Sequence, residues 1–366
     1  MVLSTDHTAT DGLSMIVQKL YSALNQHGSN VLIAGTQFLS RKKWLNTPDF
    51  SASTLGQGAF QYRINRHWCQ ADPAKHPVNN CHEMVIDSQQ RLYLLTDHPK
   101  NNIIVFDTQG NVLDSWTLDL NGAHGLTLTH DGENEFLWIC DPYRGHVVKT
   151  TLQGNALQTL PTPHQVGAYH FSMPYAPTQT AVAPNGDIYV ADGYGSQCVI
   201  QYNARGKYIQ RFGGKNAGDS TLDFAHGIAV DNRRGAGNEI LLVTSRKQSC
   251  IKQFTLDGKY LGTIALSGGY PCRPVIHGDS VVIGLCWSGA HLKPNSGFVI
   301  MLDKNNQICA TLGGHIETAK DTSKSFLVSD YSCFHHVHDV CADANGNLYV
   351  CEWNAGNIYP VKLELI

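Results

Sequence analysis

One pattern recurs along most of this chain and restricts its possible folds more than any other feature. Short stretches of alternating apolar residues are separated by Asn-Gly or Asp-Gly turns, as in NGDIYVADGYG from Asn185 and NGNLYVCE from Asn345. This arrangement is typical of consecutive antiparallel hairpins. Six copies of the unit can be aligned, beginning at Asp87, Asp131, Ala183, Asp231, His277 and Asp343. A period of about 40 to 65 residues with three or four strands per unit predicts an all-β fold, a six-bladed β-propeller.

The two ends of the repeat region are predicted to meet. The last unit is short of one strand, whereas the strand-like segment GAFQYRIN, residues 58–65, is left over before the first full unit. We expect this segment to pair with the last unit, because closure of the ring removes the exposed sheet edges. The propeller is therefore assigned to residues 58–366.

Residues 1–57 show a different pattern. Apolar residues at positions 13, 16, 17, 20, 21 and 24 follow helical spacing, and Thr10 or Asp11 is available as an N-cap. We predict an N-terminal helical extension that packs on the propeller or mediates oligomerisation.

Composition excludes several classes of partner. The net charge is −3, and no basic or acidic block occurs, which disfavours nucleic acid or an anionic membrane as partner. No apolar run approaches the ~20 residues of a membrane span, and the N-terminus lacks the pattern of a secretory signal. The 11 cysteines are scattered without a CxxC pair. We therefore expect reduced thiols and a cytoplasmic location.

Three of the 18 histidines occupy the same place in three units. They are His124 in AHGLTL, His226 in AHGIAV and His338 in VHDVCA, and they lead into the second, fourth and sixth units. Alternate blades of a six-bladed ring lie ~120° apart around a central channel, so the three imidazoles should converge there. Three imidazoles hold zinc, or another divalent transition metal, and leave one coordination position open for chemistry.

Two further histidines bear on this prediction. His82, in NNCHEMVIDS, stands at the matching place in the first unit and is a fourth ligand, a pocket residue or a filler of the channel. His336 shares a strand face with His338, since side chains alternate along a strand, and is a candidate pocket residue. Histidines that precede strands also cap turns or fill a channel without any metal, and this alternative stays open.

The residues around these histidines resemble a known family. The HGL, HGI and HD histidines, together with PTQTAVAPNGDIYVADGYG and FAHGIAVD, resemble the peptidyl-α-hydroxyglycine α-amidating lyases, which are six-bladed propellers with zinc held by three histidines. The resemblance covers most of residues 58–366 and is strongest over residues 177–254. Propellers of the NHL-repeat class share the blade pattern without the histidines, so the ligand positions carry the specificity.

The resemblance implies roles for individual residues. The three repeat histidines correspond to the zinc ligands, and Tyr194 in ADGYG corresponds to the active-site tyrosine of the family. Arg246 in VTSRKQSC and Arg63 in YRINRHW are similar to two arginines of that family. A structural calcium ion would involve Asp339 and the backbone of Leu126.

These residue types fit one reaction class. Zinc lowers the pKa of a hydroxyl, tyrosine can act as the base, and arginine pairs with a substrate carboxylate. We expect a zinc-dependent carbon–nitrogen lyase that cleaves a small N-(α-hydroxyalkyl)amide carrying a carboxylate, such as an α-hydroxyglycine derivative, into an amide and glyoxylate or a similar aldehyde. Two alternatives are a metal-dependent propeller hydrolase acting on a lactone or ester, and a non-catalytic NHL-type interaction scaffold.

Overall fold

The computed structural model describes residues 54–289, 291, 293–318, 324–330 and 333–366. All of them belong to one compact unit, Asp49–Ile366. The helix predicted from the apolar spacing at positions 13–24 lies outside the described residues. Strand β1 (Thr54–Gln57) begins before residue 58, in the segment that was assigned to the N-terminal extension.

Five four-stranded antiparallel sheets follow one another along the chain, each built from consecutive strands. The first contains β3 (Cys81–Ile86), β4 (Leu92–Thr96), β5 (Ile103–Phe106) and β6 (Val112–Trp116). The second contains β7 (Gly125–Asp131), β8 (Asn134–Asp141), β9 (His146–Thr151) and β10 (Ala156–Thr159). The third contains β11 (Gln179–Val182), β12 (Ile188–Ala191), β13 (Cys198–Tyr202) and β14 (Tyr208–Gly213). The fourth contains β15 (Ala225–Asp231), β16 (Ile240–Ser245), β17 (Cys250–Thr255) and β18 (Tyr260–Ala265). The fifth contains β19 (Gly269–His277), β20 (Ser280–Ser288), β21 (Phe298–Leu302) and β22 (Ile308–Leu312).

The sixth sheet joins the two ends of the described chain. Its strands, in spatial order, are β25 (Val337–Ala342), β26 (Leu348–Glu352), β27 (Val361–Leu365), β2 (Phe60–Asn65) and β1. β2 pairs antiparallel with β27, with Ile64 opposite Leu363, and both side chains are buried. The predicted closure by residues 58–65 is confirmed, and the fold is an all-β six-bladed propeller.

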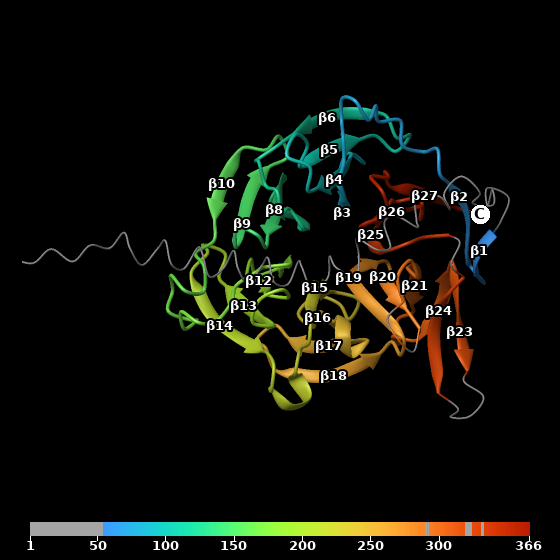
Figure 1. Ribbon diagram of the computed structural model, residues 1–366. Helices are drawn as coiled ribbons and strands as arrows, with labels where there is room; N and C mark the ends of the chain where they lie inside the picture. The colour runs from blue at the N-terminus through green and yellow to red at the C-terminus, as the bar shows by residue number, and fades with distance from the viewer. Residues whose placement is uncertain (1–53, 290, 292, 319–323, 331–332) are drawn as a thin grey trace, which may run out of the picture. The chain divides into compact units, whose positions relative to one another are not determined.

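The first strand of each of the first five sheets, together with β25, surrounds the centre of the propeller. These strands, β3, β7, β11, β15, β19 and β25, contact one another in a closed cycle (Figure 1). The outermost strands have a different environment: along β14 the residues alternate between half-buried and exposed, whereas β3 is almost entirely buried. Strands covered on both faces, such as β5 with the sequence IIVF, can therefore read as apolar runs, whereas the outermost strand β14, YIQRFG, mixes apolar and polar residues.

The turns explain why the repeat is visible in the sequence. In the last unit, Asp343 Oδ1 accepts hydrogen bonds from the backbone N–H groups of Asn345 and Asn347. Gly346 between them has φ +80°, a conformation that side-chain-bearing residues rarely adopt. The turn itself therefore requires this pattern, and Asp107 and Asp303 accept the same pair of backbone hydrogen bonds in the first and fifth blades.

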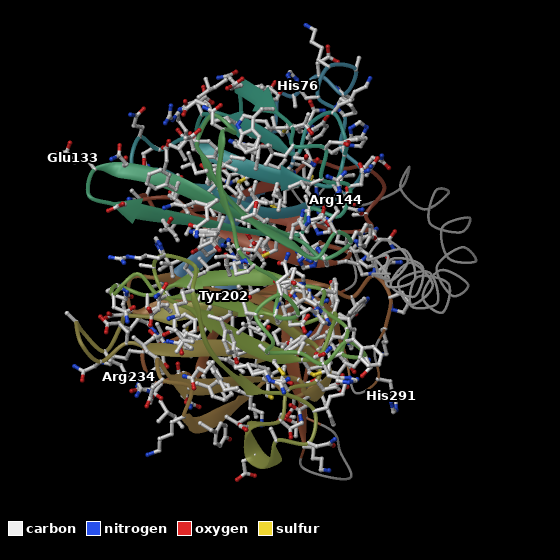
Figure 2. All side chains as sticks on the ribbon, turned by 90° about the vertical axis from the view of Figure 1, so that its left-hand side faces the viewer. His76, Glu133, Arg144, Tyr202, Arg234 and His291 are labelled. Atoms are coloured by element: carbon white, nitrogen blue, oxygen red, sulfur yellow. The ribbon has the colours of Figure 1, made fainter. Side chains whose placement is uncertain are left out.

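The strands are held together by apolar packing between neighbouring blades. Side chains fill the interior of the sheets and the spaces between them (Figure 2), and the largest cluster of buried apolar residues spans the fourth, fifth and sixth blades. The 11 cysteines, all in the described part of the chain, are free thiols. Among the described residues, no helix has the length and hydropathy of a membrane span.

One hairpin lies outside the blade pattern and was not predicted. β23 (Gly314–Thr318) and β24 (Ser325–Ser329) form a two-stranded sheet after the fifth blade. The backbone of Leu327 bonds to Gly289 and to Ser267, which anchors the hairpin to the fifth blade.

Candidate metal centre

The innermost strands are irregular where they carry histidine. The pairing register shifts between Cys81 and Glu83 in β3, between Ala225 and Ile228 in β15, and between Val337 and Asp339 in β25. These intervals contain His82, His226 and His338. A β-bulge bends a strand and re-aims its side chains, so the bulges provide a local reason for the convergence of the imidazoles.

The structure brings together the three histidines that the repeat singled out. The ring centroid of His124 lies 4.7 Å from those of His226 and His338, and the latter two are 4.9 Å apart. All three side chains are buried. Alternate blades thus deliver three imidazoles to one place, as their spacing in the sequence predicted.

His82 joins the same group from the first blade. Its ring centroid lies 5.1 Å from that of His124 and 4.9 Å from that of His338. Ligand nitrogens of His82, His124 and His338 all lie within 4.8 Å of one another. We call His82, His124, His226 and His338 the histidine layer. Two possible ligand sets share His124 and His338 and take either His226 or His82 as the third member.

Hydrogen bonds to backbone carbonyls fix the tautomers of two imidazoles. His124 Nδ1 lies 2.9 Å from the carbonyl oxygen of Thr178, and His338 Nδ1 lies 2.9 Å from the carbonyl oxygen of His82. A carbonyl only accepts, so each Nδ1 carries the proton and each Nε2 presents a lone pair. The two Nε2 atoms nevertheless lie 3.2 Å apart. Two lone pairs this close repel each other unless a proton or a metal ion lies with them.

The other polar atoms of the histidine layer show whether a shared proton or a metal ion fits this position better. Burial lowers the pKa of His124, His226 and His338 well below the usual value, so these imidazoles are neutral at pH 7. The buried Nδ1 atoms of His82 and His226 have no hydrogen-bond partner. A neutral imidazole nitrogen without a proton is the form that binds metal. The layer therefore fits a divalent transition metal, whereas a shared proton is disfavoured by the low pKa values.

Tyr194 faces the histidine layer. Its hydroxyl lies 2.8 Å from His124 Nε2 and 3.1 Å from His226 Nε2, and its ring centroid lies 5.0 Å from that of Phe224. Burial raises the pKa of the Tyr194 phenol, and the charge of Arg246 acts against this effect. Tyr194 is thus the group with an ionisable O–H nearest to the point where the imidazoles converge.

The loop that carries Tyr194 tolerates only glycine on either side of it. A Cβ on Gly193 would lie 2.1 Å from the carbonyl oxygen of Ala225, and a Cβ on Gly195 would lie 2.1 Å from Asp192 Oδ1. Asp192 orders the loop, because its carboxylate accepts the N–H of Ser196 and the hydroxyl of Tyr169. The DGYG motif therefore has a steric reason, and Asp192 is a positioning residue that the sequence did not reveal.

Arg246 lies beside this group, in the 3-10 turn Arg246–Gln248 between β16 and β17. Its side chain is buried, with Nη2 2.8 Å from Cys272 Sγ. The guanidinium carbon lies 5.7 Å from the ring centroid of Phe224 and 5.5 Å from that of Trp287. Burial alone raises the pKa of Cys272, but the hydrogen bond with Cys286 and the charge of Arg246 lower it overall. No carboxylate of the described chain forms an ion pair with Arg246, and its hydrogen bonds go to Cys272 Sγ and the carbonyl of Pro271.

Two other predicted residues lie elsewhere. Arg63 is exposed on β2, opposite Glu364 of β27, and two further strands separate β2 from β25. An outer strand cannot place a side chain in the channel, so the structure does not bring Arg63 to the site. His336 is buried between Trp287 and Trp353, with ring centroids 6.1 and 5.8 Å away, and its Nε2 accepts the N–H of Asn295. It belongs to the aromatic surroundings of Arg246.

Glu83 and Asp339, which directly follow two histidines of the histidine layer, form a second polar layer with Arg273 of β19. Arg273 Nε and Nη2 donate to the two carboxylate oxygens of Asp339 at 3.0 and 2.7 Å. Nη1 donates to the carbonyl oxygen of Leu126 at 3.0 Å, and Nη2 to that of Met84 at 2.9 Å. Glu83 lies 3.8 Å from the same guanidinium. We call Glu83, Arg273 and Asp339 the charge layer.

The charge layer does not fit the calcium ion expected at Asp339 and Leu126. Calcium needs carboxylate and carbonyl oxygens as ligands. The Arg273 guanidinium already binds both carboxylate oxygens of Asp339 and the carbonyl of Leu126. The resemblance predicted the oxygen ligands but not the cation that occupies them.

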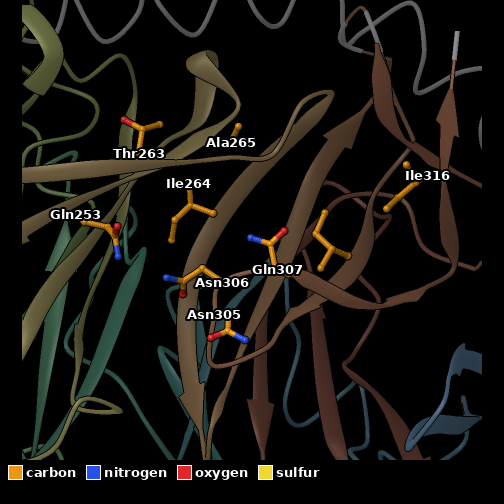
Figure 3. A pocket seen from close by; sticks show the side chains of 9 residues that line it. Gln253, Thr263, Ile264, Ala265, Asn305, Asn306, Gln307 and Ile316 are labelled. Atoms are coloured by element: carbon orange, nitrogen blue, oxygen red, sulfur yellow. The ribbon is translucent and has the colours of Figure 1, made fainter. Parts of the chain in front are cut away.

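A groove on the outer strands has a different character. It is lined by Gln253, Thr263, Ile264, Ala265, Asn305, Asn306, Gln307, Ile308 and Ile316 (Figure 3). These side chains are amides, a hydroxyl and apolar groups, so none of them titrates or binds a metal strongly. The groove is therefore not the candidate site.

Comparison with known proteins gives relatives but no family. No protein-family model matches the chain. The human NHL repeat-containing protein 3 is 26% identical over 214 residues, and the mouse NHL repeat-containing protein 3 is 23% identical over 207 residues. These alignments cover 55% and 49% of this chain, and 59% and 60% of the two relatives. The match thus spans less than two thirds of each relative.

Solved structures with the same fold include two lyases. A streptogramin B lyase has a TM-score of 0.54 at 13% identity, covering 85% of this chain and 100% of that chain. Virginiamycin B lyase from Staphylococcus aureus has a TM-score of 0.52 at 14% identity, covering 83% of this chain and 100% of that chain. At these identities the likeness shows the fold alone. The chain is a six-bladed β-propeller with relatives among NHL repeat-containing proteins.

Proposed function

We propose that the histidine layer binds a divalent transition metal, zinc in the first instance, and that the propeller is a carbon–nitrogen lyase acting on an N-(α-hydroxyalkyl)amide. One observation carries this proposal: the unprotonated Nε2 atoms of His124 and His338 face each other at 3.2 Å in a buried site. The unpartnered Nδ1 atoms of His82 and His226 add to it. Buried polar atoms are normally satisfied, so these close and unpartnered nitrogen atoms support a ligand that the chain itself does not supply.

The chemistry follows from what surrounds that point. A bound zinc ion supplies Lewis acidity, which lowers the pKa of a substrate hydroxyl. Tyr194, within hydrogen-bond distance of two of the imidazoles, takes the hydroxyl proton and returns it to the departing amide nitrogen. The C–N bond breaks as the carbon–oxygen bond becomes a carbonyl, so the products are an amide and an aldehyde. Because burial raises the pKa of Tyr194, its action as a base requires added positive charge at the site.

Arg246 supports a substrate with a carboxylate. Its guanidinium is buried between Phe224 and Trp287 and carries no ion pair with the described carboxylates. Arginine binds a carboxylate through two parallel hydrogen bonds, which would orient the carbinol carbon. An α-hydroxyglycine derivative, which releases glyoxylate, combines these features. The free thiols favour a reducing compartment such as the cytoplasm.

Metal content and aldehyde release test the proposal together. The purified chain, dialysed without chelator, should retain about one transition metal ion per chain. His338→Ala should lose the metal, whereas His130→Ala, a matched change at a histidine with a 60% exposed side chain on β7, should retain it. Tyr194→Phe should keep the metal and lose about 10²- to 10⁴-fold in aldehyde release from α-hydroxyglycine amides. Full turnover in Tyr194→Phe would remove the tyrosine from the mechanism.

The same measurements distinguish two other functions. Metal binding with turnover of a lactone or ester, but no aldehyde from hydroxy-amides, would identify a metal-dependent hydrolase. No retained metal, even after zinc is offered, would make the histidine layer a filler of the channel. The curated relatives are named for their NHL repeats, and in that case a non-catalytic interaction scaffold would be the better description.

A further inference from the structure

We propose that Arg273 is the fixed cation of the propeller channel: its guanidinium replaces a structural calcium ion and holds three of the histidine-bearing segments in position. Arg273 lies on β19, in the fifth blade, which contributes no histidine to the histidine layer. The proposed roles of Arg273 in calcium independence and in positioning the strands do not depend on the lyase activity. Only the zinc readout described below rests on the proposed function.

The guanidinium reaches three different blades close to their histidines. Met84 follows His82 by two residues on β3, and Asp339 directly follows His338 on β25. Leu126 follows His124 by two residues on β7. Arg273 bonds to all three, through two carbonyl oxygens and one carboxylate. One side chain therefore fixes the backbone within two residues of His82, His124 and His338.

The carboxyl groups beside Arg273 are buried and accept further hydrogen bonds. The side chains of Asp339 and Glu83 are 0% and 1% exposed, and that of Arg273 is 12% exposed. Asp339 also accepts the N–H of Met84, and Glu83 accepts the N–H of Leu126 and the side-chain amide of Gln179. A buried carboxylate is stable only with such partners. A calcium ion could bind these oxygens only by displacing the guanidinium.

Removal of the guanidinium converts the site into an oxygen-lined one. Arg273→Ala leaves the carboxylates of Asp339 and Glu83 and the carbonyls of Leu126 and Met84 around a space of side-chain size. Two carboxylates and two carbonyls are a ligand set that suits calcium. The inference therefore predicts that the variant gains a calcium dependence that the wild-type chain lacks.

Thermal unfolding with and without calcium is the first experiment. The wild-type chain should have the same Tm in EGTA and in millimolar calcium. Arg273→Ala should unfold at a clearly lower temperature in EGTA and regain much of the loss with calcium but not with magnesium, which demands a smaller octahedral site. Arg273→Lys should lose stability without calcium rescue, because its ammonium keeps the positive charge but cannot make the fork-shaped contacts.

Arg233 provides a matched control. Its guanidinium donates to both oxygens of Asp231 at 2.8 Å and to the carbonyl of Asp303 at 3.0 Å, and its side chain is 5% exposed. It is thus a buried arginine fork of the same kind, but its partner Asp231 lies five residues after His226 on β15, farther along the strand than the residues that Arg273 contacts beside the other histidines. Arg233→Ala should also lower the Tm, without a change in zinc affinity.

Zinc affinity distinguishes a role of Arg273 in positioning the histidines from a role in stabilising the fold alone. Folded Arg273→Lys should bind zinc about 10- to 100-fold more weakly than the wild-type chain, the range typical of residues that orient metal ligands. Calcium bound to the dialysed wild-type chain, or a wild-type Tm raised by calcium, would overturn the inference. So would an Arg273→Lys variant with wild-type stability and zinc affinity. If the wild-type chain binds no zinc, the proposed function fails, while the calcium results still decide the role of Arg273.

Discussion

Two successive residue layers on the innermost strands differ in how their polar atoms are paired. In the histidine layer, two Nε2 atoms face each other at 3.2 Å, and two Nδ1 atoms are buried without a partner. In the charge layer, one residue further along the strands, Arg273 bonds to Asp339 and to two carbonyls. Buried polar groups are normally satisfied, and exceptions call for an explanation. The charge layer is arranged to hold the strands, and the histidine layer is arranged to receive a ligand.

This difference gives opposite expectations for truncation. A side chain of the charge layer cannot be removed without leaving a buried, unpaired charge, which is costly. His82 and His226 each have a buried Nδ1 without a partner in the metal-free chain, so removal of either imidazole should cost little stability but should weaken metal binding. The following predictions test this contrast from the largest expected effect to the smallest.

Asp339→Ala should have the largest effect on stability. It strips Arg273 of its only carboxylate fork and leaves the guanidinium buried among carbonyls, so we expect a loss of about 3–5 kcal/mol in the free energy of unfolding. Urea denaturation followed by fluorescence measures this loss. Asp114→Ala, at an exposed position on β6, should change the stability by less than about 0.5 kcal/mol. Equal effects of the two variants would remove the distinction between the layers.

His226→Ala and His82→Ala separate the two possible ligand sets. We expect His226→Ala to weaken zinc binding at least about 100-fold, beyond the effect of losing a residue that only orients a ligand. We expect His82→Ala to weaken it less than about 10-fold, because the repeat places His226, with His124 and His338, on alternate blades and leaves His82 beside this set. Zinc competition with a chromogenic chelator measures both affinities, and the reverse order would make His82 the third ligand. In zinc-free buffer, both variants should keep nearly wild-type stability.

The features that depend on the repeat could be predicted from the sequence. Blade number, the closing strand and the meeting of His124, His226 and His338 all depend on spacing along the chain, and spacing is visible in the sequence. The residue after each histidine could also have been compared between units. Such a comparison would have singled out Arg273, which holds the equivalent place in the fifth unit.

The sequence does not reveal a side chain's hydrogen-bond partner when that partner is a backbone group or lies in another blade. Arg273 bonds to carbonyls of residues 147 and 189 positions away, and a carbonyl has no residue type to recognise. The calcium ion expected at Asp339 and Leu126 was placed without regard to this side chain, which binds the same oxygen atoms. Arg63 was assigned by linear resemblance, whereas its position on β2, an outer strand of the closing blade, keeps it away from the channel.

Glu352 is a buried carboxylate that no arginine binds through two hydrogen bonds, and it lies beside a histidine-bearing strand. It lies on β26 opposite Val337 of β25 and accepts the backbone N–H of His335. Burial raises its pKa to about 7, an effect that the backbone hydrogen bond of His335 only partly opposes. Asp339 has a guanidinium on both oxygens, so the two residues contrast an unpaired and a paired carboxylate on neighbouring strands.

Glu352→Gln should therefore change how stability depends on pH, with the smallest effect of the three. The folded chain binds the Glu352 proton more tightly than the unfolded chain, so this residue stabilises most at low pH, and its contribution is lost as the pH rises from the ordinary glutamate value of about 4.3 to about 7. The variant lacks that loss and should gain stability relative to the wild-type chain across this interval. Urea unfolding at a series of pH values measures the difference. Glu317→Gln, at an exposed position on β23, should track the wild-type curve. A difference between wild type and Glu352→Gln that does not vary with pH would mean that Glu352 ionises as freely as a solvent-exposed glutamate, and the buried carboxylate without an arginine would then cost the fold nothing.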